Sequence, residues 1–140
     1  MIKYNAAAMI GKIKDAVHNR IVSDLGKHGI EGIVPSHGDI LVFLYQKDEL
    51  SIKELAEKIH RTQPTVTVLV NKLEKLGYVE RIKSEEDGRI TSIKLTEKGI
   101  QLEPVFRDVS GSLNDVIYGG LSSAQREQLE WLLDHVHNRF

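Results

Sequence analysis

The sequence predicts a mainly α-helical fold with a small β-hairpin wing. The expected fold is a winged helix-turn-helix with six helices in all, and the helices from both termini flank the central part. Three observations lead to this prediction. Two helical segments with N-terminal capping signals follow each other closely in the middle of the chain. Two alternating, β-branched stretches come next, separated by a short polar turn. Apolar stripes with helical spacing occupy both flanks of a chain whose 140 residues suffice for one domain with a core.

The N-terminal flank predicts one long helix, a loop and a second helix. The apolar residues of the first helix form a stripe with helical spacing: Ile10, Ile13, Val17, Ile21 and Leu25. That helix ends in the glycine-containing stretch 26–29, and the loop continues through Gly32 and Pro35. We expect the second helix to run from about His37 to Gln46, with Ser36 as its N-cap.

The two central helices carry the clearest local signals. Ser51 and Glu54 form a capping-box pattern at the start of the first helix. Thr62 is the expected N-cap of the second helix, and Pro64 lies in its first turn, where a missing amide costs little. Gly77 suits the C-terminal cap of this helix. The residues expected to face inward are Ile52, Leu55, Ala56 and Ile59 in the first helix and Val66, Leu69, Val70 and Leu73 in the second.

The wing is predicted directly after the second central helix. Residues 79–83 and 90–95 alternate and are rich in β-branched side chains, so they are expected to form two strands. Residues 84–88, with the sequence SEEDG, form the turn between them. A ribbon of this kind next to a helix-turn-helix is typical of a device that contacts DNA, because it can reach the backbone or the minor groove beside the second helix.

The C-terminal flank predicts a fifth helix that begins at Thr96 and a sixth that begins at Ser122, with a break at residues 119–120. The sixth helix is strongly apolar and includes Trp131 and Phe140. A winged-helix domain needs only about 70–80 residues, so the terminal helices need another use. A self-complementary interface is such a use, because a two-fold dimer places two recognition helices about 34–36 Å apart, one turn of DNA.

The outward face of the second central helix offers groups that bind DNA. Gln and Asn can bond adenine edges, Thr can bond a base or a phosphate, and Val can touch a thymine methyl group. A solvated polar face is the plainer interpretation of such a helix taken alone, and the attached wing favours DNA. The residues on this face are Gln63, Thr65, Thr67, Val68, Asn71 and Lys72.

These segments resemble the MarR family of winged-helix transcriptional regulators. The resemblance is carried by LAEKIHRTQPTVTVLVNKLEKLGYVER, then SEEDGR, then LTEKG. It implies a single domain over residues 1–140, in which 1–34 and 100–140 form dimerisation helices and 35–99 form the winged DNA-binding lobe. It also implies a homodimeric, sequence-specific DNA-binding regulator, which we expect to be a ligand-responsive repressor.

The resemblance assigns roles to residues of the wing. Arg89 corresponds to the arginine that enters the minor groove, and Asp87 is expected to pair with Arg81, which opens the first wing strand. Many relatives carry a basic residue where this chain has Val68, so their base preferences do not transfer. The full set of expected DNA contacts is Arg61, Thr62, Gln63, Thr65, Thr67, Val68, Asn71, Lys72, Lys83 and Arg89.

Charge and composition agree with this prediction without requiring it. The net charge is −1, but residues 51–98 carry ten Lys and Arg against eight Asp and Glu. The small positive excess therefore lies in the segment expected to bind DNA, and it predicts few phosphate contacts per subunit. The chain has no cysteine, which excludes disulfides and thiolate chemistry. The N-terminus resembles neither a signal peptide nor a membrane span, so we expect a cytoplasmic protein.

Enzymatic and metal-binding patterns are absent from the sequence. It contains no glycine-rich phosphate loop, no HExxH motif and no serine elbow, so we expect no enzyme and no cofactor. His28 and His37, with Glu31 and Asp39 nearby, could hold a metal ion or a small anion. Solvated loop residues are the more common outcome for such a group, and we expect no metal site.

Two questions stay open at this point. The alternative to a DNA-binding regulator is a winged-helix module that contacts another protein. An effector, where one exists, is expected between the dimerisation helices and the winged lobe, lined by His18, His37 and Tyr45, each of which could equally be a core or a solvated residue. Family resemblance implies a small aromatic or anionic compound, which suits an apolar crevice with a few polar groups. A chain without an effector is the other outcome.

Overall fold

The computed structural model describes residues 1–83 and 88–140. The helices are α1 (Ala6–Lys27), α2 (Pro35–Gln46), α3 (Ile52–Ile59), α4 (Gln63–Lys75), α5 (Glu97–Gln101), α6 (Glu103–Tyr118) and α7 (Ser123–His137), and the strands are β1 (Glu49–Ser51), β2 (Val79–Lys83) and β3 (Thr91–Leu95). Since α5 and α6 adjoin at Leu102, the predicted order of six helices is confirmed, with the fifth helix divided. No helix in the described part of the chain is long and apolar enough to cross a membrane.

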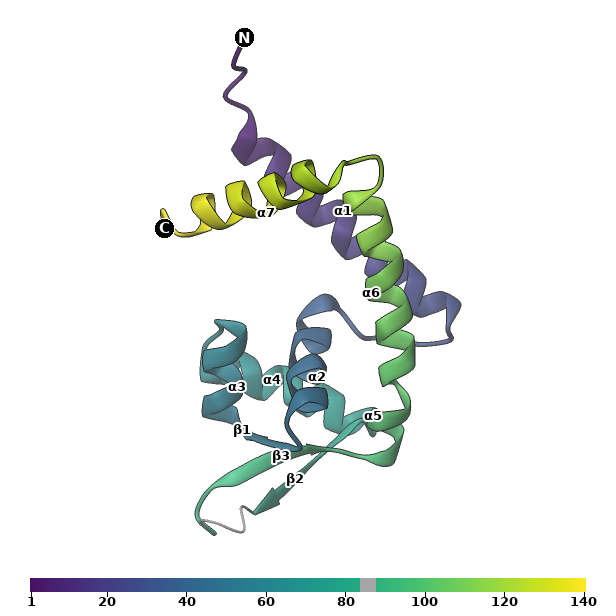
Figure 1. The fold of residues 1–140 in the computed structure, drawn as a ribbon. Helices are drawn as coiled ribbons and strands as arrows, with labels where there is room; N and C mark the ends of the chain where they lie inside the picture. Colours follow the sequence, from purple (N-terminus) through teal and green to yellow (C-terminus); the bar gives the residue numbers. More distant parts are fainter. Residues whose placement is uncertain (84–87) are drawn as a thin grey trace.

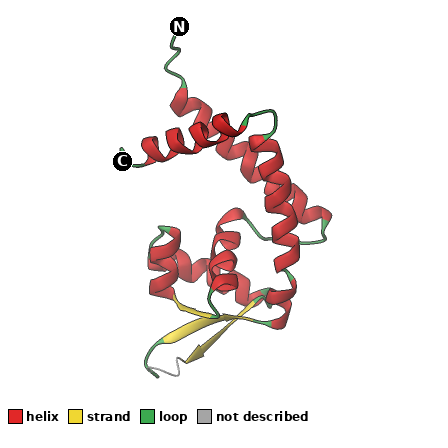
Figure 2. Ribbon diagram, in the orientation of Figure 1, coloured by secondary structure: helices red, strands yellow, loops and turns green. Residues whose placement is uncertain are grey.

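The molecule has two parts, a lobe and an arm (Figure 1, Figure 2). The lobe contains α2, α3, α4, α5 and the sheet. The arm contains α1, α6 and α7, and both termini of the chain lie on it. Helix α6 begins beside the lobe and runs along α1 toward the far end of the arm, so it connects the two parts.

The sheet has three antiparallel strands in the order β1-β3-β2. Strands β2 and β3 are the predicted wing hairpin. Strand β1 is absent from the sequence-based prediction because only three residues form it, and its partner β3 lies more than forty positions further along the chain. Leu50 in β1 pairs with Ile93 in β3, and both side chains are fully buried, so β1 joins the wing to the core of the lobe.

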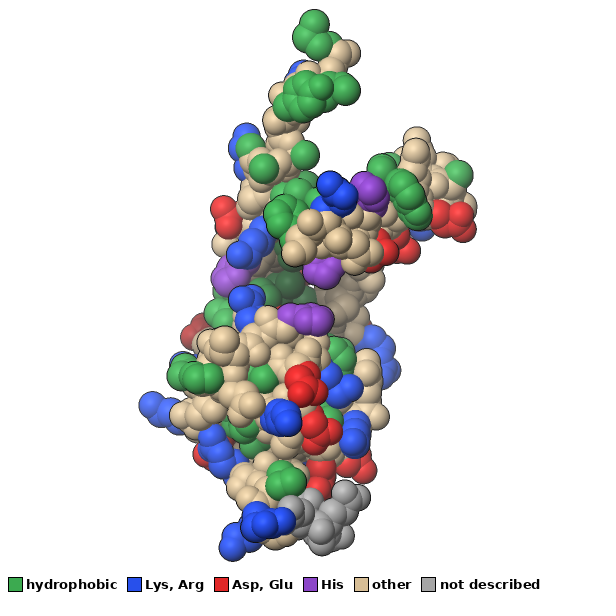
Figure 3. Space-filling model, turned by 90° about the vertical axis from the view of Figure 1, so that its left-hand side faces the viewer, with side chains coloured by type: hydrophobic (Ala, Val, Ile, Leu, Met, Phe, Trp, Pro, Cys, Tyr) green, Lys and Arg blue, Asp and Glu red, His purple; other side chains and the backbone are tan. Residues whose placement is uncertain are grey.

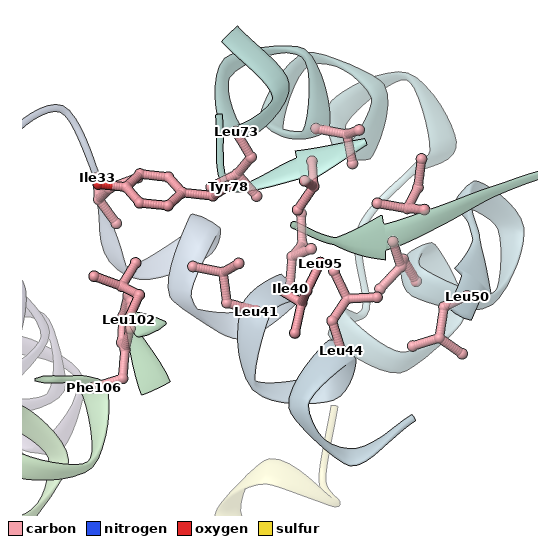
Figure 4. Packing of buried hydrophobic residues seen from close by; sticks show 14 of the residues in the cluster. Ile33, Ile40, Leu41, Leu44, Leu50, Leu73, Tyr78, Leu95, Leu102 and Phe106 are labelled. Atoms are coloured by element: carbon pink, nitrogen blue, oxygen red, sulfur yellow. The ribbon is translucent and has the colours of Figure 1, made fainter. Parts of the chain in front are cut away.

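Most of the core lies inside the lobe, and α1 and α6 add Leu25, Phe106 and Val109 to it (Figure 4). Helix α2 contributes Ile40, Leu41 and Leu44, which are at most 1% exposed and point into the cluster. Helix α4 contributes Val66, Val70 and Leu73, three of the residues predicted to face inward, while Leu69 is half-buried. Burying a side chain of this size stabilises a fold by about 1.5–3 kcal/mol relative to leaving it exposed. Apolar spacing therefore fixes which face of α4 is inward.

Most predicted helix starts are confirmed, and one is wrong. Ser51, Thr62, Thr96 and Ser122 each accept a hydrogen bond from the backbone amide three residues later. Helix α2, however, begins at Pro35 and not near His37, so Ser36 is not its cap. The Nδ1 atom of His37 instead accepts the Val34 amide hydrogen at 3.0 Å, which satisfies a donor that a cap would otherwise leave open.

The division between α5 and α6 follows from Pro104. Proline has no amide hydrogen and its ring clashes with the carbonyl four residues earlier, so the helix that begins after Thr96 cannot continue unbroken. The amide of Leu102 bonds the Gly99 carbonyl at 3.2 Å, a tighter turn than the α-helical one, and α6 then starts in a new direction. This change of direction carries the chain from the lobe to the arm.

Candidate nucleic-acid interface

Helices α3 and α4 form the predicted helix-turn-helix. His60 ends α3 in the left-handed conformation, with φ at 56°, which reverses the chain within a short turn. Thr62 then caps α4: its Oγ1 accepts the Thr65 amide hydrogen and donates to the Thr65 hydroxyl oxygen at 3.0 Å. The first turn of α4 is therefore held by its own side chains, at the end of the helix that would meet a phosphate.

The C-terminal end of α4 is locked to the wing and to α5. Gly77 has a φ of 85°, and the amides of Gly77 and Tyr78 bond the carbonyls of Glu74 and Leu73, as in a Schellman motif. Lys98 then donates to the Leu76 carbonyl at 2.7 Å and lies over the Tyr78 ring.

Thr96 and Gly99 complete this lock. The Thr96 hydroxyl donates to the Gly77 carbonyl at 2.5 Å. A Cβ at Gly99 would overlap the carbonyl oxygen of Tyr78, so the close approach of α5 to the end of α4 requires glycine. The LTEKG motif thus acts by fixing where α4 ends, a role that the sequence pattern did not reveal because the two segments meet only in the folded lobe.

The outward face of α4 is exposed, as expected. Gln63, Thr65, Val68, Asn71 and Lys72 are exposed, while Thr67 is half-buried and donates its hydroxyl hydrogen to the Gln63 carbonyl at 3.0 Å. Val68 is 67% exposed in the middle of this face. Val68 is thus an aliphatic side chain that lies mostly in water on an otherwise polar face of the helix. It suits an apolar contact such as a thymine methyl group.

The predicted contacts outside α4 lie at the turn and on the wing. Arg61 and Thr62, at the start of α4, are exposed. Lys83 is exposed at the end of β2, and Arg89 is exposed just before β3. Asp87 lies outside the described residues, so its predicted pairing with Arg81 stays a prediction. Figure 3 shows Lys and Arg side chains around the lobe.

Arg81 binds two residues of α4. Its Nη1 donates to the Glu74 carboxylate at 2.5 Å and its Nη2 to the Asn71 side-chain oxygen at 2.6 Å. Sequence reasoning missed Glu74. The available signal was its position three residues after Asn71, which places both on one face of the helix.

Lys72 points away from the wing, toward the loop between α1 and α2. A Cβ on Gly32 would lie 3.4 Å from Lys72 Cε and 3.5 Å from its Nζ, so the end of the lysine side chain lies beside the loop. His37 lies buried at the start of α2, and burial together with the charge of Lys72 lowers the pKa of its imidazole. A neutral His37 keeps Nδ1 free to accept the Val34 amide hydrogen.

A crevice between α2 and α6 is where the expected effector site would lie. One cavity of about 250 Å³ is lined by Tyr45, Glu103, Phe106 and Arg107, among others, and a smaller one of about 100 Å³ lies beside it, between α1, α2 and α6. Of the three expected lining residues, Tyr45 lines the larger cavity. His18 is exposed on α1 and His37 is buried at the start of α2, and neither lines these two cavities.

Three polar residues at this crevice, Tyr45, Glu103 and Arg107, already have partners. Tyr45 donates its hydroxyl hydrogen to the Gly99 carbonyl at 3.0 Å, and burial raises the pKa of this phenol. Arg107 is paired with Glu103 at 3.1 Å. Burial also raises the pKa of Asp39, which lines the smaller cavity, although the charge of Arg61 opposes the shift. The crevice therefore offers an anion no unpaired cation among its lining residues.

The arm carries the largest exposed apolar surface. Helix α7 has no buried residue, and Trp131 and Leu133 are 65% and 54% exposed. On α1, Ile13 is 53% exposed. Figure 3 shows green side chains gathered on this part of the molecule. Exposed apolar side chains that gather in one region are a feature of binding surfaces.

The histidines do not form a metal-binding group in the described part of the chain. No three His, Asp or Glu side chains there are placed to hold one ion. His135 stacks on Trp131 with ring centroids 5.4 Å apart, which gives it a packing role on α7.

The chain matches a known family and known relatives. The family model described as "MarR family" matches residues 33–91. The regulator SarZ of Staphylococcus haemolyticus is 31% identical over 97 residues, which are 69% of this chain and 65% of that protein. The repressor IacR of Pseudomonas putida is 32% identical over 100 residues, or 71% of this chain and 60% of IacR. The chain thus spans less than two thirds of the length of these curated relatives.

Solved structures agree over the whole chain. MepR of S. aureus, in a complex with DNA, is 25% identical with a TM-score of 0.86, and the match covers all of both chains. BldR of Sulfolobus solfataricus is 26% identical with a TM-score of 0.77, also over all of both chains. A MarR regulator of Methanosarcina mazei is 22% identical with a TM-score of 0.79, covering 99% of this chain and 91% of that one, and it supports the fold alone.

Proposed function

Because the chain belongs to the MarR family, we propose that it is a sequence-specific, DNA-binding transcriptional regulator and not an enzyme. The observation that carries the proposal is the exposed face of α4, with Val68 exposed at its centre and the exposed Lys83 and Arg89 of the wing beside it. The likeness to MepR, whose structure contains DNA, supports the same use of the fold. We place its action in the cytoplasm, where a regulator of this type meets its DNA.

We propose that α4 enters the major groove and that the wing reaches the neighbouring minor groove. Val68 and Gln63 then face base edges, while Lys83 contacts a phosphate and Arg89 the minor groove. A bidentate or well-packed base contact is worth about 1–3 kcal/mol of discrimination, whereas a phosphate contact mainly changes the salt dependence. Val68→Arg is therefore expected to change which bases are preferred. Equal strengthening on unrelated duplexes would place position 68 at a phosphate.

We also propose that the protein acts as a homodimer that represses transcription. The support is the exposed apolar surface of α1 and α7, which a second copy would cover. A two-fold dimer would present two α4 helices to one face of DNA, separated by about one helical turn of roughly 34–36 Å.

The effector is proposed to bind in the crevice between α2 and α6. Since Arg107 is paired with Glu103, a neutral aromatic compound suits this crevice better than an anion. Such a compound would regulate DNA binding only through unequal affinity for two spacings of the α4 helices. A thermal-shift screen with neutral phenols and benzoates, repeated on Tyr45→Ala, tests this site. Stabilisation by benzoates alone, or stabilisation that survives the substitution, would contradict it.

The test of DNA binding starts from duplexes that the protein selects from a random-sequence library. Fluorescence anisotropy at two salt concentrations then measures affinity. We expect it to fall steeply with salt because phosphate contacts release counterions. A protein that selects no duplex, or binds with no dependence on salt, would instead favour the alternative of a winged-helix module for protein contacts.

A further inference from the structure

In the described part of the chain, the side-chain hydrogen bonds that join the wing strand β2 to the helix α4 come from Arg81. Arg81 in β2 donates from two nitrogen atoms to two residues of α4: Nη1 to Glu74 at 2.5 Å and Nη2 to Asn71 at 2.6 Å. Asn71 and Glu74 are three residues apart, so they lie next to each other on the helix surface. We call Arg81, Asn71 and Glu74 the wing clamp.

The wing clamp has the geometry of a rigid connection. The guanidinium group is planar and its donors are fixed relative to one another, so two simultaneous bonds define an orientation as well as a distance. Arg81 and Glu74 have side chains 31% and 43% exposed, which keeps part of this ion pair away from water. In the sheet, Arg81 lies opposite Ile93 of β3, which is fully buried. Both strands of the wing are therefore linked to α4 through this position.

The clamp changes the role that the sequence suggests for Asn71. Reading an adenine requires the side-chain amide to offer its oxygen and its nitrogen together to the base edge. In this structure the oxygen accepts a charged hydrogen bond from Arg81, so the amide is turned toward β2. Val68, three residues earlier on α4, makes no such contact and stays 67% exposed.

We propose that Asn71 and Glu74 are positioning residues, which act through Arg81 to hold the wing at a fixed place beside α4, and that Asn71 does not read bases. The inference rests on the proposed DNA binding for its functional consequence. With the wing held in place, the distance between α4 and the wing is the same before and after DNA binding. The wing therefore does not need to become ordered when DNA binds. Preorganisation of this kind increases affinity without adding a contact.

The first arm of the test needs no DNA. Amide hydrogen exchange of β2 and β3 is measured in the free protein for the wild type, Asn71→Ala, Asn71→Asp and Glu74→Gln. Asn71→Ala removes one acceptor and is expected to speed exchange in both strands by about fivefold. Asn71→Asp keeps an acceptor for Arg81 and is expected to stay close to the wild type. Lys47→Met is the matched control, since it removes a 3.6 Å ion pair with Glu54 outside the wing.

The second arm separates positioning from base reading. The probe is a duplex that the wild type selects from a random library, together with its single-base substitutions. Asn71→Ala is expected to weaken binding to every duplex by a similar factor of about ten, with the order of preference unchanged. Loss of discrimination at one base pair, with wild-type exchange in β2 and β3, would overturn the proposal.

The two arms also distinguish failure of the clamp from failure of the proposed function. A wild type that selects no duplex would contradict the proposed DNA binding. The exchange data would still test the clamp in that case. Unchanged exchange in Asn71→Ala would overturn the clamp whether or not DNA binds. Asn71→Asp adds a negative charge near the proposed DNA face, so its exchange and its base preference are compared, not its affinity.

Discussion

The lobe and the arm differ in how they treat their apolar side chains. In the lobe, α2, α4 and the three strands close over a shared core in which many side chains are at most 1% exposed. In the arm, α7 buries no residue, and the N-terminal half of α1 is exposed throughout. The apolar side chains of the lobe are therefore buried within one chain. The arm leaves apolar side chains exposed, and this contrast is the support for the proposed homodimer.

The largest expected effect on DNA binding comes from substitutions on the exposed surface of the arm that leave the lobe folded. We expect Trp131→Asp combined with Leu133→Asp to convert a dimer to a monomer, because charges would then replace two exposed apolar side chains on different sides of α7. DNA affinity should drop by at least about a hundredfold, since one half-site is lost.

Light scattering and circular dichroism measure this outcome. Glu127→Gln, on the same helix and exposed, is the control. A dimer that survives the double substitution would place the interface elsewhere, and a wild type that is already a monomer would contradict the proposed assembly.

A second prediction breaks the lobe instead. Gly99→Ala forces a Cβ onto the Tyr78 carbonyl at the junction of α4 and α5, so we expect the free energy of unfolding to fall by about 2–4 kcal/mol. Gly111→Ala in α6 is the matched control, because no atom lies within 4 Å of its added Cβ.

In a helix interior, that control change should be neutral or stabilise by up to about 1 kcal/mol. Urea unfolding measures both variants. Equal stability of the two would mean that the close approach of α5 to α4 is not required.

A third prediction sharpens the comparison by leaving both parts folded. Arg89→Ala should weaken DNA binding by about tenfold without unfolding the protein, because the residue is exposed beside β3. Anisotropy with the selected duplex measures the affinity, and urea unfolding checks the fold. If the variant binds the selected duplex with the affinity of the wild type, Arg89 does not contact the minor groove.

The smallest expected effect is a dependence of stability on pH through His37, at the start of α2. Burial lowers the pKa of His37 below its ordinary value of 6.5, so the folded lobe favours the neutral imidazole. The stability gained is complete above pH 6.5 and is lost as the pH falls through the lowered pKa, where protonation ends the hydrogen bond from Val34.

Urea unfolding at a series of pH values tests this link. We expect His37→Gln to flatten the decrease on the acid side of pH 6.5. An unchanged pH profile would assign that decrease to other groups.

Local signals in the sequence determined most of the helical frame. The caps at Ser51, Thr62 and Ser122, the apolar spacing of α4 and the glycine at position 77 each act within a few residues, so the pattern alone is enough to place them. The wing hairpin is equally local, since a short turn joins its strands. The exposed face of α4 follows from the buried one, because a helix has only one remaining side.

Contacts between distant segments were decided only by the tertiary structure. Strand β1 exists because β3 offers it a partner, and Asn71 turns toward β2 because Arg81 lies there. Glycine at position 99 and the bond from Tyr45 to its carbonyl depend on where α5 packs. These features have no period or cap that marks them in the chain. A side chain that could bond several partners bonds the one that lies near it. Which distant residues lie near each other is decided only when the chain folds.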